Sequence, residues 1–236
     1  MFQEKCQISP KVFLFYKPKG ITSFQFVQRV KRELRARKAG HAGTLDPLAE
    51  GLMIIGIDEG TKLLKNFLKL NKVYLARITL GESRTTGDLE GEIYEEVDYR
   101  GDIDEHDIVQ ALESLRGEHQ FPAPLYSAVK VKGKPLYLYA RRGKKPPYIP
   151  LKPFFLFSYE LLKIQEARER LYVDVRLKVS SGSYIRSFAE ELGRRLSYPA
   201  TLVSLAREQI GEYHLRDACN LNLCESCDTL KEVIRK

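Results

Sequence analysis

Apolar and polar side chains alternate along the segment 171–179. A period of two is typical of a strand that buries one face and exposes the other. The segment 154–164 can pair with this strand across a turn at 166–170. Helical patterns are mixed with other strand patterns along the chain, joined by hairpins as well as crossovers. The sequence therefore predicts the α+β class.

The remaining elements follow from apolar spacing and capping residues. A helix should begin at Thr22, which forms a capping box with Gln25, and another should begin after the N-cap Asp104. The connection at 81–91 is polar, and Leu64, Phe67 and Leu68 should point inward from a helix at 61–70. Strands are expected at 12–16, 52–57, 73–80 and 200–209, and further helices at 185–196 and 228–235.

Length and composition indicate one large globular domain. The chain has 236 residues, of which 43% are hydrophobic and 30% charged. No apolar leader and no apolar run of membrane-spanning length are visible, so we expect a soluble protein of the cytoplasm with no membrane partner. The net charge of +8 favours a polyanionic partner.

The four cysteines are expected to remain reduced thiols, because no export signal is visible. Cys224 and Cys227 form a CxxC pair, and Cys219 and His214 precede it, so a zinc site can be considered. The spacing matches no standard zinc finger, and a second CxxC is missing. We therefore expect no metal.

One carboxylate, Asp46, lies in a constrained loop between Gly40 and Gly51. The glycines permit unusual backbone angles, and Pro47 restricts both itself and the residue before it. Such a loop can hold a carboxylate in one place for chemistry. It can also be an ordinary turn, since Gly, Asp and Pro are common in turns.

Two basic segments suit a nucleic-acid partner. A helical segment at 29–38 carries six basic residues and one acid, and the proline-rich segment at 121–153 contains a basic stretch with tyrosines at 130–145. Basic residues interleaved with aromatics fit RNA phosphates and bases. The alternatives are a solvated helix face and a solubilising loop.

Five ordered motifs between about residues 12 and 215 resemble the TruB family of tRNA pseudouridine-55 synthases. The motifs are Lys-Pro-Lys-Gly-Ile-Thr-Ser at 17–23, Gly-His-Ala-Gly-Thr-Leu-Asp-Pro at 40–47, Lys-Val-Tyr at 72–74, the segment 125–141 from Leu-Tyr-Ser-Ala-Val-Lys to Tyr-Ala-Arg, and Ser-Gly-Ser-Tyr-Ile-Arg at 181–186.

The resemblance implies a pseudouridine synthase fold with a mixed, mainly antiparallel central sheet flanked by helices and loops. A catalytic domain would occupy 1–215, with an RNA-gripping loop at about 121–153. The tail at 216–236 is too short for the C-terminal PUA domain of bacterial members. The implied catalytic residues are Asp46, Tyr74 and Arg186, and the implied substrate-binding residues are His41, Lys17, Lys19, Lys62, Tyr126, Lys130, Tyr137 and Arg141.

The implied reaction isomerises uridine 55 in the tRNA T stem-loop after base flipping, with no cofactor. Asp46 would be the nucleophile or a base at the ribose, and the sequence leaves both open. Arg186 would pair with a carboxylate, although a surface arginine at a helix start is the simpler interpretation. No obligatory protein partner is expected. The alternatives are a non-catalytic RNA-binding or tRNA-folding module on the same fold, and the same chemistry on another RNA, including guide-RNA-dependent synthases.

Overall fold

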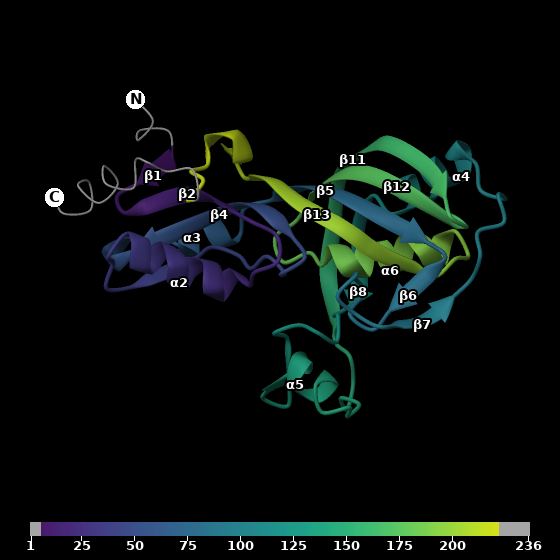
Figure 1. Cartoon of the computed structure of the whole chain (residues 1–236), viewed down its shortest axis with the longest axis horizontal. Helices are drawn as coiled ribbons and strands as arrows, with labels where there is room; N and C mark the ends of the chain where they lie inside the picture. The colour runs from purple at the N-terminus through teal and green to yellow at the C-terminus, as the bar shows by residue number, and fades with distance from the viewer. Residues whose placement is uncertain (1–5, 222–236) are drawn as a thin grey trace. The chain divides into compact units, whose positions relative to one another are not determined.

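The computed structural model describes residues 6–221, which form two compact units. Unit 1 contains residues up to Tyr74 and from Leu205 onward, and unit 2 contains Leu75–Ser204. The chain passes between the units inside two strands, β5 (Lys72–Leu80) and β13 (Ala200–Ile210). Among the described residues, ten strands form one sheet, in which β5 and β13 are hydrogen-bonded neighbours (Figure 1).

Unit 1 is organised around β4 (Glu50–Ile57), which is buried along almost its whole length. It pairs antiparallel with β2 (Val12–Lys17) and β3 (Ala39–His41), and parallel with the end of β13. A strand that is buried on both faces has a nearly continuous apolar sequence, and residues 52–57 have such a sequence. The smaller elements are β1 (Gln7–Ser9), β14 (Tyr213–His214), α3 (Lys65–Leu68) and the 3₁₀ turns η1 (Asp58–Lys62) and η2 (Leu215–Asp217).

Helix α2 (Ser23–Glu33) packs on unit 1 through its apolar stripe. The predicted capping box is confirmed, because the Thr22 side chain accepts from the Gln25 amide and the Gln25 side chain accepts from the Thr22 amide. Phe26 meets Phe15 of β2 edge to face at 6.4 Å between ring centroids. The opposite face of the helix is left for the basic side chains.

Unit 2 contains the long hairpin of β11 (Leu151–Ala167) and β12 (Arg170–Val179), shown in green in Figure 1. Residues 168 and 169 turn the chain with positive φ, and alternate residues of β12 are buried, as predicted. Helix α6 (Ile185–Arg195) stacks Phe188 on Phe154 of β11 at 5.5 Å. The other elements are β6 (Glu82–Arg84), β7 (Ile93–Glu96), α4 (Glu105–Ser114), β8 (Gly117–Pro122), β9 (Lys130–Val131), β10 (Lys134–Pro135) and α5 (Leu136–Ala140).

Several local predictions are wrong. The basic segment 29–38 is helical only to Glu33, since the Asp58 side chain accepts from the Arg37 and Lys38 amides and leads the chain into β3. The segment 61–70 is not one helix but a 3₁₀ turn and one short α-turn. Leu68 is exposed there, whereas it was predicted to be inward.

The connections also contain short strands. Residues 39–41 belong to β3 rather than to the loop, because they pair with β4. Within the predicted polar connection at 81–91, residues 82–84 form β6, which pairs with β7 at 93–96. The mixed, mainly antiparallel α+β arrangement is nevertheless as predicted. In residues 6–221 no helix is long and apolar enough to cross a membrane.

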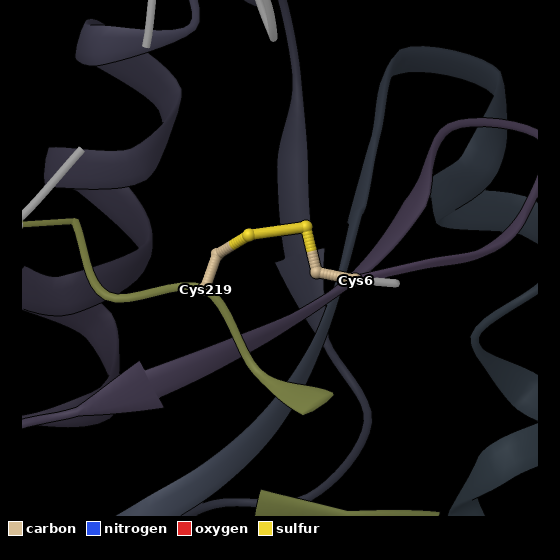
Figure 2. Close-up of a disulfide and its surroundings, with 2 residues drawn as sticks. All are labelled: Cys6 and Cys219. Atoms are coloured by element: carbon tan, nitrogen blue, oxygen red, sulfur yellow. A yellow bond between two sulfur atoms is a disulfide. The ribbon is translucent and has the colours of Figure 1, made fainter. Parts of the chain in front are cut away.

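A disulfide joins Cys6 to Cys219 across 213 residues of sequence (Figure 2). The prediction of reduced thiols is wrong for this pair. Backbone hydrogen bonds between Cys219 and both Leu14 and Tyr16 hold the C-terminal segment against β2 and bring the two cysteines together. Cys219 is therefore not a thiolate metal ligand, while the CxxC pair and the helix predicted at 228–235 lie outside the described residues.

Candidate active site

The Asp46 loop, defined here as residues 42–49, connects β3 to β4 and is fixed by the motif at 17–23. Ser23 Oγ accepts from the Leu45 amide at 2.8 Å and donates to the Leu45 carbonyl at 2.7 Å. The Gly20 amide donates to the Pro47 carbonyl at 2.7 Å. The loop is therefore bound on both sides of Asp46, whose side chain is half-buried. An ordinary surface turn would not be held in this way.

Of the lysines predicted to contact substrate, Lys17 is fully buried. Its ammonium donates to the Ala49 carbonyl at 2.7 Å and to the Pro18 carbonyl at 2.9 Å. Lys17 therefore also binds the end of the Asp46 loop. Lys19 and Lys62 are exposed in the same unit. Their side chains are accessible to a ligand that binds from solvent.

His41, at the end of β3, is half-buried beside Arg207. Burial and the charge of Arg207 lower its pKa, and a backbone contact at Gly43 opposes the shift. Its Nδ1 atom is buried with no hydrogen-bond partner among residues 6–221. The lowered pKa favours the neutral imidazole, and its Nδ1 atom remains available to a ligand.

Tyr74 and Lys72 lie on the same face of β5, because alternate side chains of a strand point the same way. Tyr74 is buried, with 7% of its surface exposed. Lys72 is also buried and donates to the Leu68 carbonyl at 2.8 Å. Burial, and then the charge of Arg207, lower the pKa of Lys72 to about 8.

Arg186, at the start of α6 in unit 2, is buried rather than at the surface, so the surface interpretation is excluded. Its guanidinium donates to the Thr86 carbonyl at 2.8 Å and to the Tyr126 carbonyl at 3.1 Å. Its Nε lies 3.8 Å from Oδ2 of Asp88. Arg186 thus connects the 81–91 segment to the start of the predicted RNA-gripping loop.

Asp88 is a residue that the sequence reasoning missed. It is buried, and its Oδ1 accepts from Thr86 Oγ1 at 2.5 Å and from the Glu90 amide at 3.1 Å. Glu190, also near Arg186, has a pKa raised by burial, and the arginine opposes that shift. An aspartate in a glycine-rich polar connection gave no local signal of burial, because such residues are common in turns.

The predicted RNA-gripping loop carries four predicted substrate residues. Tyr126, Lys130 and Arg141 are exposed, and Tyr137 is half-buried with the Arg141 guanidinium 5.5 Å from its ring centroid. The loop has its own small apolar core. A pocket of about 450 Å³ opens on it, with an apolar lining and lysines at its rim: Thr85, Leu125, Tyr126, Ala140, Gly143, Lys144, Lys145, Pro146 and Ile149.

The model of the TruB family of pseudouridylate synthases (N-terminal domain) matches residues 31–185. That range is more than half of the chain. This chain belongs to the TruB family. The match includes the Asp46 loop, β5 and the segment that ends at α6, so the predicted family and the predicted fold are confirmed.

Curated TruB-family relatives cover most of the chain. It is 39% identical over 211 residues to tRNA pseudouridine synthase B of Thermotoga maritima, and the match covers 89% of this chain and 66% of that protein. It is 36% identical over 221 residues to tRNA pseudouridine synthase B of Aquifex aeolicus, with 94% and 75% covered. The chain therefore spans just under two thirds of the length of the Thermotoga protein.

Solved structures share the TruB-family fold. A chain in the crystal structure of a Cbf5-Nop10-Gar1 complex superposes with a TM-score of 0.69 and 26% identity, covering 94% of this chain and 55% of that one. A chain of the archaeal box H/ACA sRNP Nop10-Cbf5 complex gives a TM-score of 0.67 at 24% identity, covering 97% and 58%. The second likeness supports the fold alone.

The predicted site residues of this TruB-family chain are divided between the two units. Unit 1 holds Asp46, His41, Lys17, Lys19, Lys62 and Tyr74, and unit 2 holds Arg186, Tyr126, Lys130, Tyr137 and Arg141. Asp88 in unit 2 and Arg207 in unit 1 were not predicted. For Arg207 a weak signal existed, because strand alternation from Leu205 places it on a buried face.

Proposed function

We propose that this chain is a tRNA pseudouridine synthase that acts on uridine 55 of the T loop. The observation that carries the proposal is the Asp46 loop, in which one half-buried carboxylate is held by hydrogen bonds on both sides. Phosphate binding alone needs no such carboxylate. Membership of the TruB family and its curated relatives support this chemistry.

The reaction is an isomerisation in which no atom is lost. The bond from uracil N1 to ribose C1′ breaks, the base turns, and a bond from C5 to C1′ forms. The proton on C5 leaves and N1 takes one up. Asp46 acts either as the nucleophile at the sugar or as a base at the ribose. Its function requires the ionised form, which a cation favours, and the family resemblance proposes Arg186 for that role.

Tyr74 and His41 would contact the flipped uracil and the vacated stack. Flipping costs a few kcal/mol, which contacts to the extruded base must offset. Tyr74 provides an aromatic surface and a hydroxyl on a rigid strand, and it would relay the C5 proton. The lowered pKa of His41 favours its neutral form, which would stack without adding charge. No metal or organic cofactor is proposed.

The substrate is proposed to bind through the exposed basic residues. Lys19 and Lys62 in unit 1, and Lys130 and Arg141 in unit 2, are placed for phosphates. Tyr126 borders the apolar pocket, and Tyr137 adds a second aromatic surface. An unpaired base can stack on such groups. We expect the enzyme to work in the cytoplasm and without an obligatory protein partner.

The test is incubation with unmodified tRNA transcripts, followed by mapping of pseudouridine by position. We expect product at position 55 and none in the Asp46→Asn variant, since asparagine is nearly isosteric but cannot act as an anion. RNA affinity should stay close to wild type. Asp217→Asn, a charge-matched change at a partly exposed aspartate of unit 1, should react normally.

Each other outcome selects a different function. Substantial turnover by Asp46→Asn would refute the role of the carboxylate. Tight RNA binding by an inactive wild-type protein would favour the non-catalytic RNA-binding module. Product at another position, or only with an added guide RNA, would favour the same chemistry on a different RNA.

A further inference from the structure

Arg207 lies at the centre of unit 1, where β13 runs parallel to β4. It is one of the largest fully buried side chains, with 1% of its surface exposed. Its register partner is Gly51, whose φ is +114°. A Cβ on Gly51 would lie only 2.4 Å from the Arg207 carbonyl oxygen, so the two strands approach as closely as glycine allows.

The guanidinium of Arg207 binds three backbone carbonyls around the Asp46 loop. Its Nε donates to Leu52 at 2.8 Å, its Nη1 to Thr44 at 3.2 Å and its Nη2 to Gly43 at 3.2 Å. The planar fork of arginine can serve three acceptors at once, whereas a lysine ammonium is a compact point charge on a flexible stem. One side chain therefore joins the start of the loop to the first half of strand β4.

Arg207 has no carboxylate partner in the described part of the chain. A buried cation that meets only carbonyl oxygens is costly unless its hydrogen bonds are well made. Lys72 is also buried, and within residues 6–221 its ammonium donates only to the Leu68 carbonyl. Burial, and then the charge of Arg207, lower its pKa. An apolar residue would fill the space under the loop without these costs, so stability alone does not account for an arginine here.

We propose that Arg207 is a positioning residue that fixes the backbone of residues 43 and 44 and thereby sets the orientation of Asp46. Ser23 and Lys17 bind the loop from the side of the 17–23 motif, and Arg207 binds it from the side of β13. With the backbone held from both directions, the carboxylate does not reorganise when RNA binds. The catalytic part of this inference rests on the proposed function of Asp46.

The test compares Arg207→Lys and Arg207→Met with wild type by single-turnover kinetics at saturating tRNA, RNA titration and hydrogen exchange. We expect the rate constant to fall about 100-fold in both variants, the cost of a misplacement of about 1 Å. RNA affinity should stay within about threefold, since rate and ground-state binding report different interactions. The amides of residues 42–49 should exchange faster, while those of β12 should not change.

The matched control is Arg77→Lys, because Arg77 is a partly exposed arginine that binds Asp174 in unit 2. It should leave the rate and the exchange of residues 42–49 unchanged. Two results would overturn the proposal: a folded Arg207→Lys variant with wild-type rate, or faster exchange that is equal throughout the protein and so reports a loss of global stability.

Wild-type hydrogen exchange tests the inference even where both variants fail to fold. The amides of Leu45 and Ala49 should then exchange as slowly as those of β4. Rapid exchange at these positions would overturn the proposal that the loop backbone is held rigidly. If the wild-type protein makes no pseudouridine, the proposed function fails, but the exchange data still decide whether Arg207 holds the loop. The two failures are therefore distinguishable.

Discussion

Replacing Asp88 by asparagine should weaken both the stability of unit 2 and the proposed catalysis. Asparagine keeps an oxygen that can accept from Thr86 Oγ1 and the Glu90 amide, as Oδ1 of Asp88 does. It replaces the charged Oδ2, which lies 3.8 Å from Arg186 Nε, by a neutral amide. The change therefore removes one charge and leaves the shape of the site almost intact.

The magnitude follows from the burial of the pair, whose side chains are 5% and 3% exposed. Opposite charges about 4 Å apart interact by about 4 kcal/mol at an effective dielectric constant of 20. Arg186 keeps its two carbonyl partners, and Glu190 lies near its charge. We therefore expect a loss of about 2–3 kcal/mol in the free energy of unfolding, below the 3–5 kcal/mol typical of a fully broken buried pair.

Urea unfolding and single-turnover kinetics measure the two effects. The rate constant should fall more than RNA affinity, because Asp88 orients Arg186 and does not itself contact RNA in this proposal. The control is Asp174→Asn, which breaks the bidentate pair with Arg77, whose side chains are 19% and 40% exposed. An exposed pair contributes about 1 kcal/mol or less. If Asp88→Asn is no more destabilising than this control and turns over normally, the reasoning is refuted.

Three other changes test separate features. Replacing Lys144 and Lys145, both exposed at the pocket rim, by alanine should lower the slope of log K against log salt by up to about one unit per lost phosphate contact. The free energy of unfolding of Lys72→Met, taken relative to wild type, should be higher at pH 7 than at pH 10.5 by about 3 kcal/mol. The reason is that the pKa of Lys72 is about 8 in the native state and 10.5 in the unfolded state. Wild type binds fewer protons when folded in this window, so its own stability rises with pH. Cys6→Ser should cost about 2–5 kcal/mol, and dithiothreitol should lower the melting temperature of wild type but not of the variant.

Each of these outcomes has a clear opposite. An unchanged salt slope would show that the two rim lysines do not touch phosphate. A constant stability difference between Lys72→Met and wild type from pH 7 to pH 10.5 would contradict the lowered pKa. A wild-type melting temperature indifferent to reductant would contradict the disulfide.

Local sequence patterns determined several of the regular elements and placed Asp46 in a constrained loop. The β11–β12 hairpin follows from alternation in 171–179, and the start of α2 follows from the Thr22–Gln25 capping box. Both depend on residues close together in the chain, where spacing alone decides which side chains share a face. The ordered motifs similarly named Asp46, Tyr74 and Arg186 before any contact was known.

Contacts across long stretches of chain were decided only by the tertiary structure. Arg207 binds Leu52 across 155 residues, Arg186 binds Thr86 across 100, and Cys6 meets Cys219 across 213. Nothing in the sequence near Asp88 shows that its charge is buried, and strand alternation gives only a weak signal for Arg207. Burial depends on which distant segments pack over each residue. Spacing along the chain determines on which face of a helix or strand a side chain lies. Packing between distant segments determines which residues that face contacts and whether it is buried.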